Sequence, residues 1–144
     1  LPQFVPTYMC YKTHADNGSL YNTPNSWAIY CCGKVFRYLL DNGGLKSQAK
    51  RNEEKAAVLY DFLDGSSFFR ATAEKDSRSL MNVRFVTPSM EEDAAVIAAA
   101  KAAGFENLKG HKSAGGLRAS IYNAMPKAGV EALTDFLRKY EKQR

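Results

Sequence analysis

Residues 110–118, which read GHKSAGGLR, combine three cations with three glycines. Arginine presents a rigid fork of donors that suits a carboxylate or a phosphate, and lysine supplies a compact point charge. His111 adds a donor whose charge changes near neutral pH. The glycines let the backbone adopt turns and bring its N–H groups close to an anion. This stretch therefore predicts a site for a small ligand with two anionic groups.

A simpler interpretation of the same residues stays open. A glycine-rich hairpin with surface cations would give the same pattern, because short motifs are often matched by chance. Arg118 favours the ligand interpretation, since it falls within a strand pattern, where a long charged side chain on a half-buried face needs a partner.

A second polar cluster, SLYNTPN at 19–25, comes just before a long apolar stretch. Asn22 and Thr23 could form a turn with Pro24. Their side chains and N–H groups could equally hold a phosphate.

The elements that would position these residues follow from the hydrophobic pattern. Residues 1–24 carry three prolines and no steady period, which predicts an extended, loop-rich lead segment. Residues 26–42 predict a helix with Ser26 as its N-cap and Gly43 as its end. That helix is apolar nearly all round, so we expect it to be buried, with a second body packed against it.

Hydrophobic periods of 3.6 and 2 residues predict the remaining elements. A helix over 45–64 places Leu45, Ala49, Ala56, Leu59 and Leu63 on one side. The expected strands are 68–72, 80–87, a short one near Leu108, and 117–122. The expected helices are 91–104, with Ser89 and Glu92 at capping-box spacing before it, and 127–142. This order predicts an α+β fold with a small, mostly antiparallel sheet covered on one face by helices.

The composition narrows the class of protein. A chain of 144 residues, 45% hydrophobic and 24% charged, is typical of one globular domain, and it has no apolar run long enough to span a membrane. Three cysteines, two of them adjacent, favour reduced residues in the cytoplasm or an organelle stroma. The net charge of +5 is spread among acids, so nucleic-acid binding is an alternative that the pattern does not favour.

Four segments together resemble the C-terminal part of the phosphoserine aminotransferase family: 17–25, 51–64, 78–85 and, above all, LKGHKSAGGLRASIYNAMP at 108–126. The resemblance implies a pyridoxal 5'-phosphate enzyme of the aspartate-aminotransferase fold that works as a homodimer. It implies transfer of an amino group between glutamate and 3-phosphohydroxypyruvate, which gives O-phosphoserine and 2-oxoglutarate in serine biosynthesis.

The resemblance also implies roles for five residues. Arg118 would hold the substrate α-carboxylate, His111 and Lys112 would face the substrate phosphate, and Asn22 and Thr23 would reach the cofactor phosphate of the partner subunit. Two positions depart from the family pattern: Lys112 replaces the usual arginine, and Asn25 replaces a proline and could cap the following helix.

The resemblance further implies that part of the enzyme lies outside this chain. Residues 1–24 would be an active-site loop continuing from a large cofactor-binding domain, and residues 25–144 the small domain with its interdomain helix. The lysine that forms the Schiff base would belong to the large domain, so we expect this chain alone to be inactive. A non-catalytic anion-binding regulatory module remains the alternative.

Overall fold

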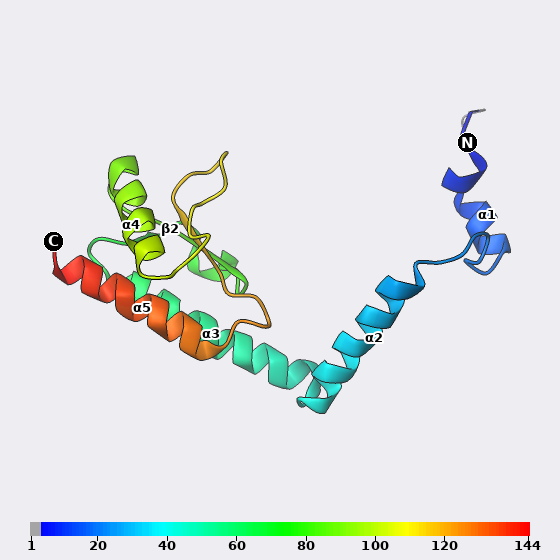
Figure 1. Cartoon of the computed structure of the whole chain (residues 1–144), viewed down its shortest axis with the longest axis horizontal. Helices are drawn as coiled ribbons and strands as arrows, with labels where there is room; N and C mark the ends of the chain where they lie inside the picture. Colours follow the sequence, from blue (N-terminus) through cyan, green and yellow to red (C-terminus); the bar gives the residue numbers. More distant parts are fainter. Residues whose placement is uncertain (1–3) are drawn as a thin grey trace. The chain divides into compact units, whose positions relative to one another are not determined.

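The computed structural model describes residues 4–144 and divides the chain into two compact units, with the division after Asn42 (Figure 1). The first unit contains the short 3-10 helix η1 (Thr7–Met9), α1 (Tyr11–Asp16) and α2 (Ser26–Asp41). The predicted domain boundary near residue 24 concerns the complete enzyme and stays a prediction.

The prediction of an extended, loop-rich lead segment is wrong at η1 and α1, while the rest of residues 4–24 contains no helix or strand; residues 1–3 lie outside the described part. η1 and α1 form there because local contacts hold them. The His14 ring contacts Tyr8 O through Nε2 at 2.6 Å, and Lys12 pairs with Asp16 one turn later. The Lys12–Asp16 pair, at i and i+4, supports a short helix that the count of prolines does not reveal.

Helix α2 lies within one residue of the predicted range at each end, and its cap is Asn25, the alternative to Ser26. The Asn25 side chain accepts a hydrogen bond from Ala28 N at 3.1 Å, and Ser26 is already the first helical residue. The chain leaves the helix through Gly43, whose φ of +90° is favourable only for glycine.

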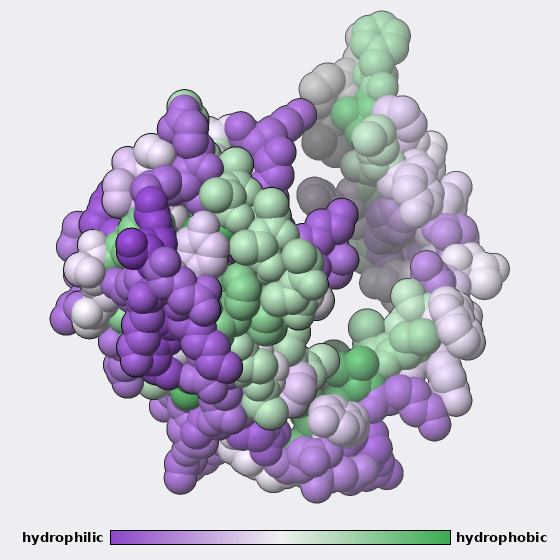
Figure 2. All heavy atoms as spheres, turned by 60° about the vertical axis from the view of Figure 1, so that its left-hand side comes forward, coloured by the Kyte–Doolittle hydropathy of each residue, from purple (hydrophilic) through white to green (hydrophobic). Residues whose placement is uncertain are grey.

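The expected burial of α2 is wrong within this chain, since none of its residues is buried. Trp27 is 73% exposed and Phe36 is 63% exposed. Figure 2 shows hydrophobic (green) side chains at the surface of the chain among white and purple ones. An apolar pattern therefore predicts that a helix packs against another surface, but it does not show that this surface belongs to the same chain.

The second unit contains three long helices, one short helix and three strands. They are α3 (Gly44–Gly65), β1 (Arg70–Ala71), the 3-10 helix η2 (Lys75–Ser77), β2 (Asn82–Val86), α4 (Met90–Ala102), β3 (Leu117–Ser120) and α5 (Lys127–Lys142). The strands form an antiparallel sheet in the order β1-β2-β3, and the strand expected near Leu108 is a single bridge between Lys109 and Leu117. The predicted α+β class is confirmed.

Alternation along the strands gives the sheet one apolar and one polar face. Val83 and Phe85 of β2 lie opposite Ala119 and Leu117 of β3, and all four are buried. They join one core with residues of the helices, namely Leu59 and Leu63 of α3, Val96 and Ala100 of α4, and Val130 and Leu137 of α5. α3 and α5 run side by side beneath the sheet residues they cover (Figure 1). The opposite face, with Arg84 and Arg118, is half-buried.

The first turns of α3 depart from the predicted amphipathic pattern. Leu45 is 77% exposed and Ala49 is exposed, whereas Ala56, Leu59 and Leu63 are buried as predicted. The helix is longer than the core that it covers, and a periodic pattern cannot show where that core begins.

A buried lysine holds the turn between β3 and α5. Lys55 of α3 donates to Tyr122 O at 2.7 Å and to Met125 O at 3.1 Å, and burial lowers the pKa of its ammonium. The neighbouring Asn52 donates to Asn123 Oδ1 at 2.8 Å. These bonds to carbonyl and amide oxygens satisfy a cation that would otherwise be costly to bury.

The far end of α5 is tied to the start of β1. Glu141 Oε1 accepts hydrogen bonds from Ser66 Oγ, Ser67 N and Phe68 N at 2.9–3.1 Å. Burial raises the pKa of this carboxyl, but the hydrogen bonds outweigh that effect and leave the pKa lowered. Over residues 4–144, the structure has no helix long and apolar enough to cross a membrane.

Candidate functional site

The glycines of GHKSAGGLR fold the loop tightly back on itself before β3. Gly110 N donates to Gly116 O at 2.8 Å, and a Cβ on Gly110 would lie 2.0 Å from Gly115 O. Gly116 has a φ of +69°, and its Cβ would lie 2.8 Å from Val86 Cγ1. Gly110 is thus required by its close contact with the backbone of Gly115, and Gly116 by its close contact with β2.

His111 and Lys112 project from this loop and are exposed. His111 Nδ1 accepts a hydrogen bond from Ser113 N at 3.3 Å and contacts Ser113 Oγ at 2.7 Å. A backbone N–H can only donate, so the neutral imidazole carries its hydrogen on Nε2, which is left to donate outward. Lys112 makes no hydrogen bond or ion pair within residues 4–144.

His111 and Lys112 line a hollow of about 310 Å³ between the loop and α4. Lys109 lies at the same hollow, and Asp93 is the acid among its described lining residues. Asp93 Oδ1 is already engaged, because it accepts hydrogen bonds from Thr87 N and Thr87 Oγ1 at 2.9 and 2.8 Å. The hollow therefore has a cationic lining that suits an anion.

Arg118 lies in β3 on the polar face, as the alternating pattern predicted. It lines a different hollow, of about 440 Å³, together with residues of α5 such as Gly129 and Ala132. Its Nε is buried and has no hydrogen-bond partner in the part of the chain that the structure describes. Among these residues, the structure brings His111 and Lys112 to one hollow and leaves Arg118 outside it.

The polar face also carries residues that the sequence analysis did not assign to a site. Arg84 of β2 lies directly opposite Arg118. Asn82 Oδ1 accepts hydrogen bonds from Ser120 Oγ at 3.3 Å and from Tyr122 OH at 3.2 Å. Alternation along β2 puts Arg84 on the face opposite Val83 and Phe85, but only the register of β2 against β3 shows which residue it faces.

Asn22 and Thr23 belong to the first unit, and both are exposed. Asn22 Nδ2 donates to Thr23 O at 3.3 Å. An amide and a hydroxyl exposed just before a helix have the donor types that fit the phosphate of pyridoxal phosphate.

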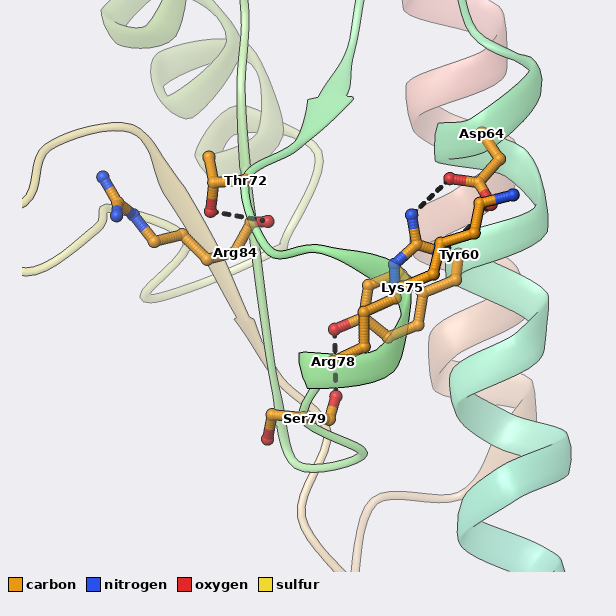
Figure 3. A network of polar contacts seen from close by, with 7 residues as sticks. All are labelled: Tyr60, Asp64, Thr72, Lys75, Arg78, Ser79 and Arg84. Carbon is orange, nitrogen blue, oxygen red and sulfur yellow. Dashed lines mark hydrogen bonds and ion pairs between the residues drawn. The ribbon is translucent and has the colours of Figure 1, made fainter.

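Another hollow, of about 620 Å³, lies at β1 and is lined by Asp64, Lys75 and Arg78, among others. Figure 3 shows how they lie: Arg78 makes a forked contact with Asp64, and Lys75 lies 3.4 Å from the same carboxylate. The hydrogen bonds from Arg78 lower the pKa of Asp64 to about 2. Asp64 is thus fully engaged by the two cations of this cluster, and the three side chains together keep one net positive charge.

The fold and the polar face together define a class of protein. It is a small α+β domain whose cationic, glycine-supported loop and strand arginine have the charge that would suit a small anion. Within residues 4–144 there is no group of three acidic, histidine or cysteine side chains that could hold a metal ion.

Comparison with known proteins gives the family. The model of the aminotransferase class-V family matches residues 4–133, and the chain belongs to that family. The chain is 50% identical over 137 residues to a phosphoserine aminotransferase of Histophilus somni, with 95% of this chain and 38% of the relative covered. It is 49% identical over 140 residues to one of Listeria monocytogenes, with 97% and 39% covered.

Solved structures show the same similarity. The chain matches a phosphoserine aminotransferase from Bacillus circulans with a TM-score of 0.91 and 42% identity, over 99% of this chain and 40% of the other. It matches the pyridoxal-phosphate-bound enzyme of Trichomonas vaginalis with a TM-score of 0.85 and 33% identity, over 96% and 40%. The chain thus spans about two fifths of the length of these relatives.

Proposed function

We propose that this chain is the C-terminal part of a phosphoserine aminotransferase. The complete enzyme would move an amino group between glutamate and 3-phosphohydroxypyruvate and would give O-phosphoserine and 2-oxoglutarate. The observation that carries the proposal is the match to proteins of that name at about half identity over nearly the whole chain.

The separation of the cations supports this substrate. A phosphorylated amino acid carries its carboxylate and its phosphate at opposite ends. Arg118 is proposed to bind the α-carboxylate through its guanidinium fork. His111, through Nε2, and Lys112 are proposed to bind the phosphate. Two separate cationic groups on one loop and strand suit such a ligand better than a single pocket would.

The cofactor is proposed to be pyridoxal 5'-phosphate, which withdraws electrons from the substrate carbon when it is bound. Asn22 and Thr23 are proposed to donate to its phosphate across the interface of a homodimer. Arg118 and the His111–Lys112 pair orient the substrate, and orientation alone can lower a barrier by several kcal/mol. The chain's free cysteines support a site in the cytoplasm or an organelle stroma.

A direct test compares the complete polypeptide with the 144-residue chain. We expect the complete enzyme to convert 3-phosphohydroxypyruvate in the presence of glutamate, and the chain alone to be inactive. Reduction with borohydride is expected to fix the cofactor on a lysine of the remaining polypeptide. Activity of the isolated chain, or a cofactor-labelled lysine within it, would disprove that division of roles.

A non-catalytic anion-binding module is the second candidate, because the hollow with His111 and Lys112 is formed entirely by this chain. Calorimetry of the 144-residue chain with O-phosphoserine separates the two. The aminotransferase proposal expects little binding until the remaining polypeptide is present, whereas a regulatory module predicts saturable binding by the chain alone.

A further inference from the structure

Arg84 and Arg118 occupy facing positions on neighbouring strands. Arg118 N donates to Leu108 O at 2.7 Å, and Arg84 O accepts from Thr72 N at 3.2 Å. The backbone groups of Arg84 and Arg118 thus form hydrogen bonds to the residues on their outer sides and not to each other. In an antiparallel sheet, the side chains of such a non-hydrogen-bonded pair lie closer together than those of a hydrogen-bonded pair. Like charges in such positions repel, so their presence requires a compensating role.

The structure shows where the Arg84 guanidinium goes. Its Nη2 donates to Ala114 O, in the loop that carries His111 and Lys112. Figure 3 shows the Arg84 side chain extending away from the Asp64–Arg78 pair, which leaves it out of that ion-pair cluster. Within residues 4–144, neither Arg84 nor Arg118 forms an ion pair, and the Nε of each is buried without a partner.

The hydrogen bond from Arg84 connects this loop to the sheet, whereas the backbone hydrogen bonds of residues 110–116 stay within the loop. Ala114 N and Gly115 N both bond to His111 O at 2.9 Å, and Gly110 N bonds to Gly116 O. None of these bonds connects the tip of the loop to the sheet. The bond from Arg84 does so, and it starts from the position opposite Arg118.

We propose that Arg84 is a positioning residue that fixes the His111–Lys112 pair at a set distance from Arg118. Its guanidinium holds the Ala114 carbonyl against the polar face of β2, and this also turns its charge away from Arg118. Arg118 is then left free for a carboxylate while the loop cations stay where a phosphate would be bound. The consequence for substrate rests on the proposed function, whereas the tie between loop and sheet does not.

The test uses the complete enzyme with Arg84→Met, which keeps the length of the side chain and removes its donors. Arg70→Met is the matched control, because Arg70 is an exposed arginine of the same sheet that lines the hollow at β1. Hydrogen exchange followed by mass spectrometry is expected to be about ten-fold faster at Ala114 and Gly115 in Arg84→Met, as loss of a charge-assisted hydrogen bond predicts. Arg70→Met should leave that exchange unchanged.

Kinetics separate positioning from general damage to the fold. We expect Arg84→Met to raise the KM for O-phosphoserine and the inhibition constant of inorganic phosphate by roughly ten-fold, with kcat little changed. A structural role alone would lower the active fraction, and so kcat, at unchanged KM. Unchanged loop exchange in Arg84→Met overturns the inference. Faster loop exchange in a polypeptide without aminotransferase activity would support the inference and reject the proposed function.

Discussion

Lys112 places a compact ammonium at a position where the resemblance implies an arginine. An ammonium keeps the charge but cannot make two parallel hydrogen bonds to one phosphate. We therefore expect Lys112→Arg in the complete enzyme to lower the KM for O-phosphoserine by about three- to ten-fold, the effect of one added charge-assisted contact. Steady-state kinetics measure this change, with Lys139→Arg on the exposed side of α5 as the control. An unchanged or higher KM would argue against phosphate at Lys112.

Asp64 gives a prediction for pH. Its pKa is lowered from 3.8 to about 2, first by the hydrogen bonds from Arg78. A carboxyl with a lowered pKa in the folded state stabilises the fold fully above its unfolded pKa, and that stabilisation is lost as the pH falls through the folded value. We expect the difference in urea midpoint between the wild type and Asp64→Asn to be constant above about pH 4 and to shrink toward pH 2.

Asp61→Asn is the matched control for that experiment, since Asp61 is exposed on the same helix and has no ion pair within the described part of the chain. A wild-type advantage over Asp64→Asn that persists at pH 2 would contradict the role of the Asp64–Arg78 pair.

Single residues were predictable where strand or helix period fixes the direction of a side chain. Arg118 follows from alternation with Leu117 and Ala119. Lys55 and Arg84 did not follow, because their partners are backbone carbonyls 30 or more positions away in the sequence. A pattern of residue types contains no signal for such bonds. His111 was recognised as a donor, but the bond from Ser113 that selects its outward nitrogen depends on the fold of the loop.

At the scale of elements, the start of β3 depends on two glycines that differ in their surroundings. A Cβ on Gly116 would meet Val86 Cγ1 at 2.8 Å and Phe85 O at 2.9 Å, whereas a Cβ on Gly115 would meet nothing. Their φ values are similar, +69° and +64°. Gly116→Ala should therefore lower the free energy of unfolding by about 2–4 kcal/mol, and Gly115→Ala by about 1–2 kcal/mol.

Urea unfolding of the two variants measures that difference, and each is the control for the other. Because φ is similar at the two glycines, the excess cost of Gly116→Ala reports the contact between the loop and β2. Equal costs would mean that the loop lies further from β2 than the structure has it.

The elements of the second unit were largely predictable, since α4, β2, β3 and α5 have clear periods and caps. Ser89 accepts a hydrogen bond from Glu92 N, as its capping-box spacing predicted. The ends of β1 and of the buried part of α3 were not predictable. They depend on which residues pair with β2 and on which turns of α3 contact the core. Only three strands are joined, and β1 contributes two residues.

At the scale of the whole molecule, α2 is the element least explained by this chain. It exposes Trp27, Ile29 and Phe36, and the chain spans about two fifths of its relatives. We propose that the remaining polypeptide covers α2. Phe36→Lys should then lower the free energy of unfolding of the complete enzyme by about 3 kcal/mol, the cost of losing a buried aromatic.

In the 144-residue chain, the same change should leave the urea midpoint nearly unchanged and reduce the binding of a dye that reports exposed apolar surface. Asp41→Lys, which introduces a lysine on α2 by reversing a charge and removes no apolar group, is the control. If Phe36→Lys is tolerated equally in both proteins, the remaining polypeptide does not pack on this part of α2.

The hydrogen bonds of Glu141 carry a practical consequence for work on this protein. One carboxylate in the last turns of α5 anchors Ser66, Ser67 and Phe68, which lead into the first strand, and Arg144 contacts Glu92 on α4. Trimming a few residues from that end, or fusing a bulky tag there, would loosen a strand some seventy positions earlier. Affinity tags and fluorophores are safer on an exposed side chain in the middle of α5, such as that of Asp135.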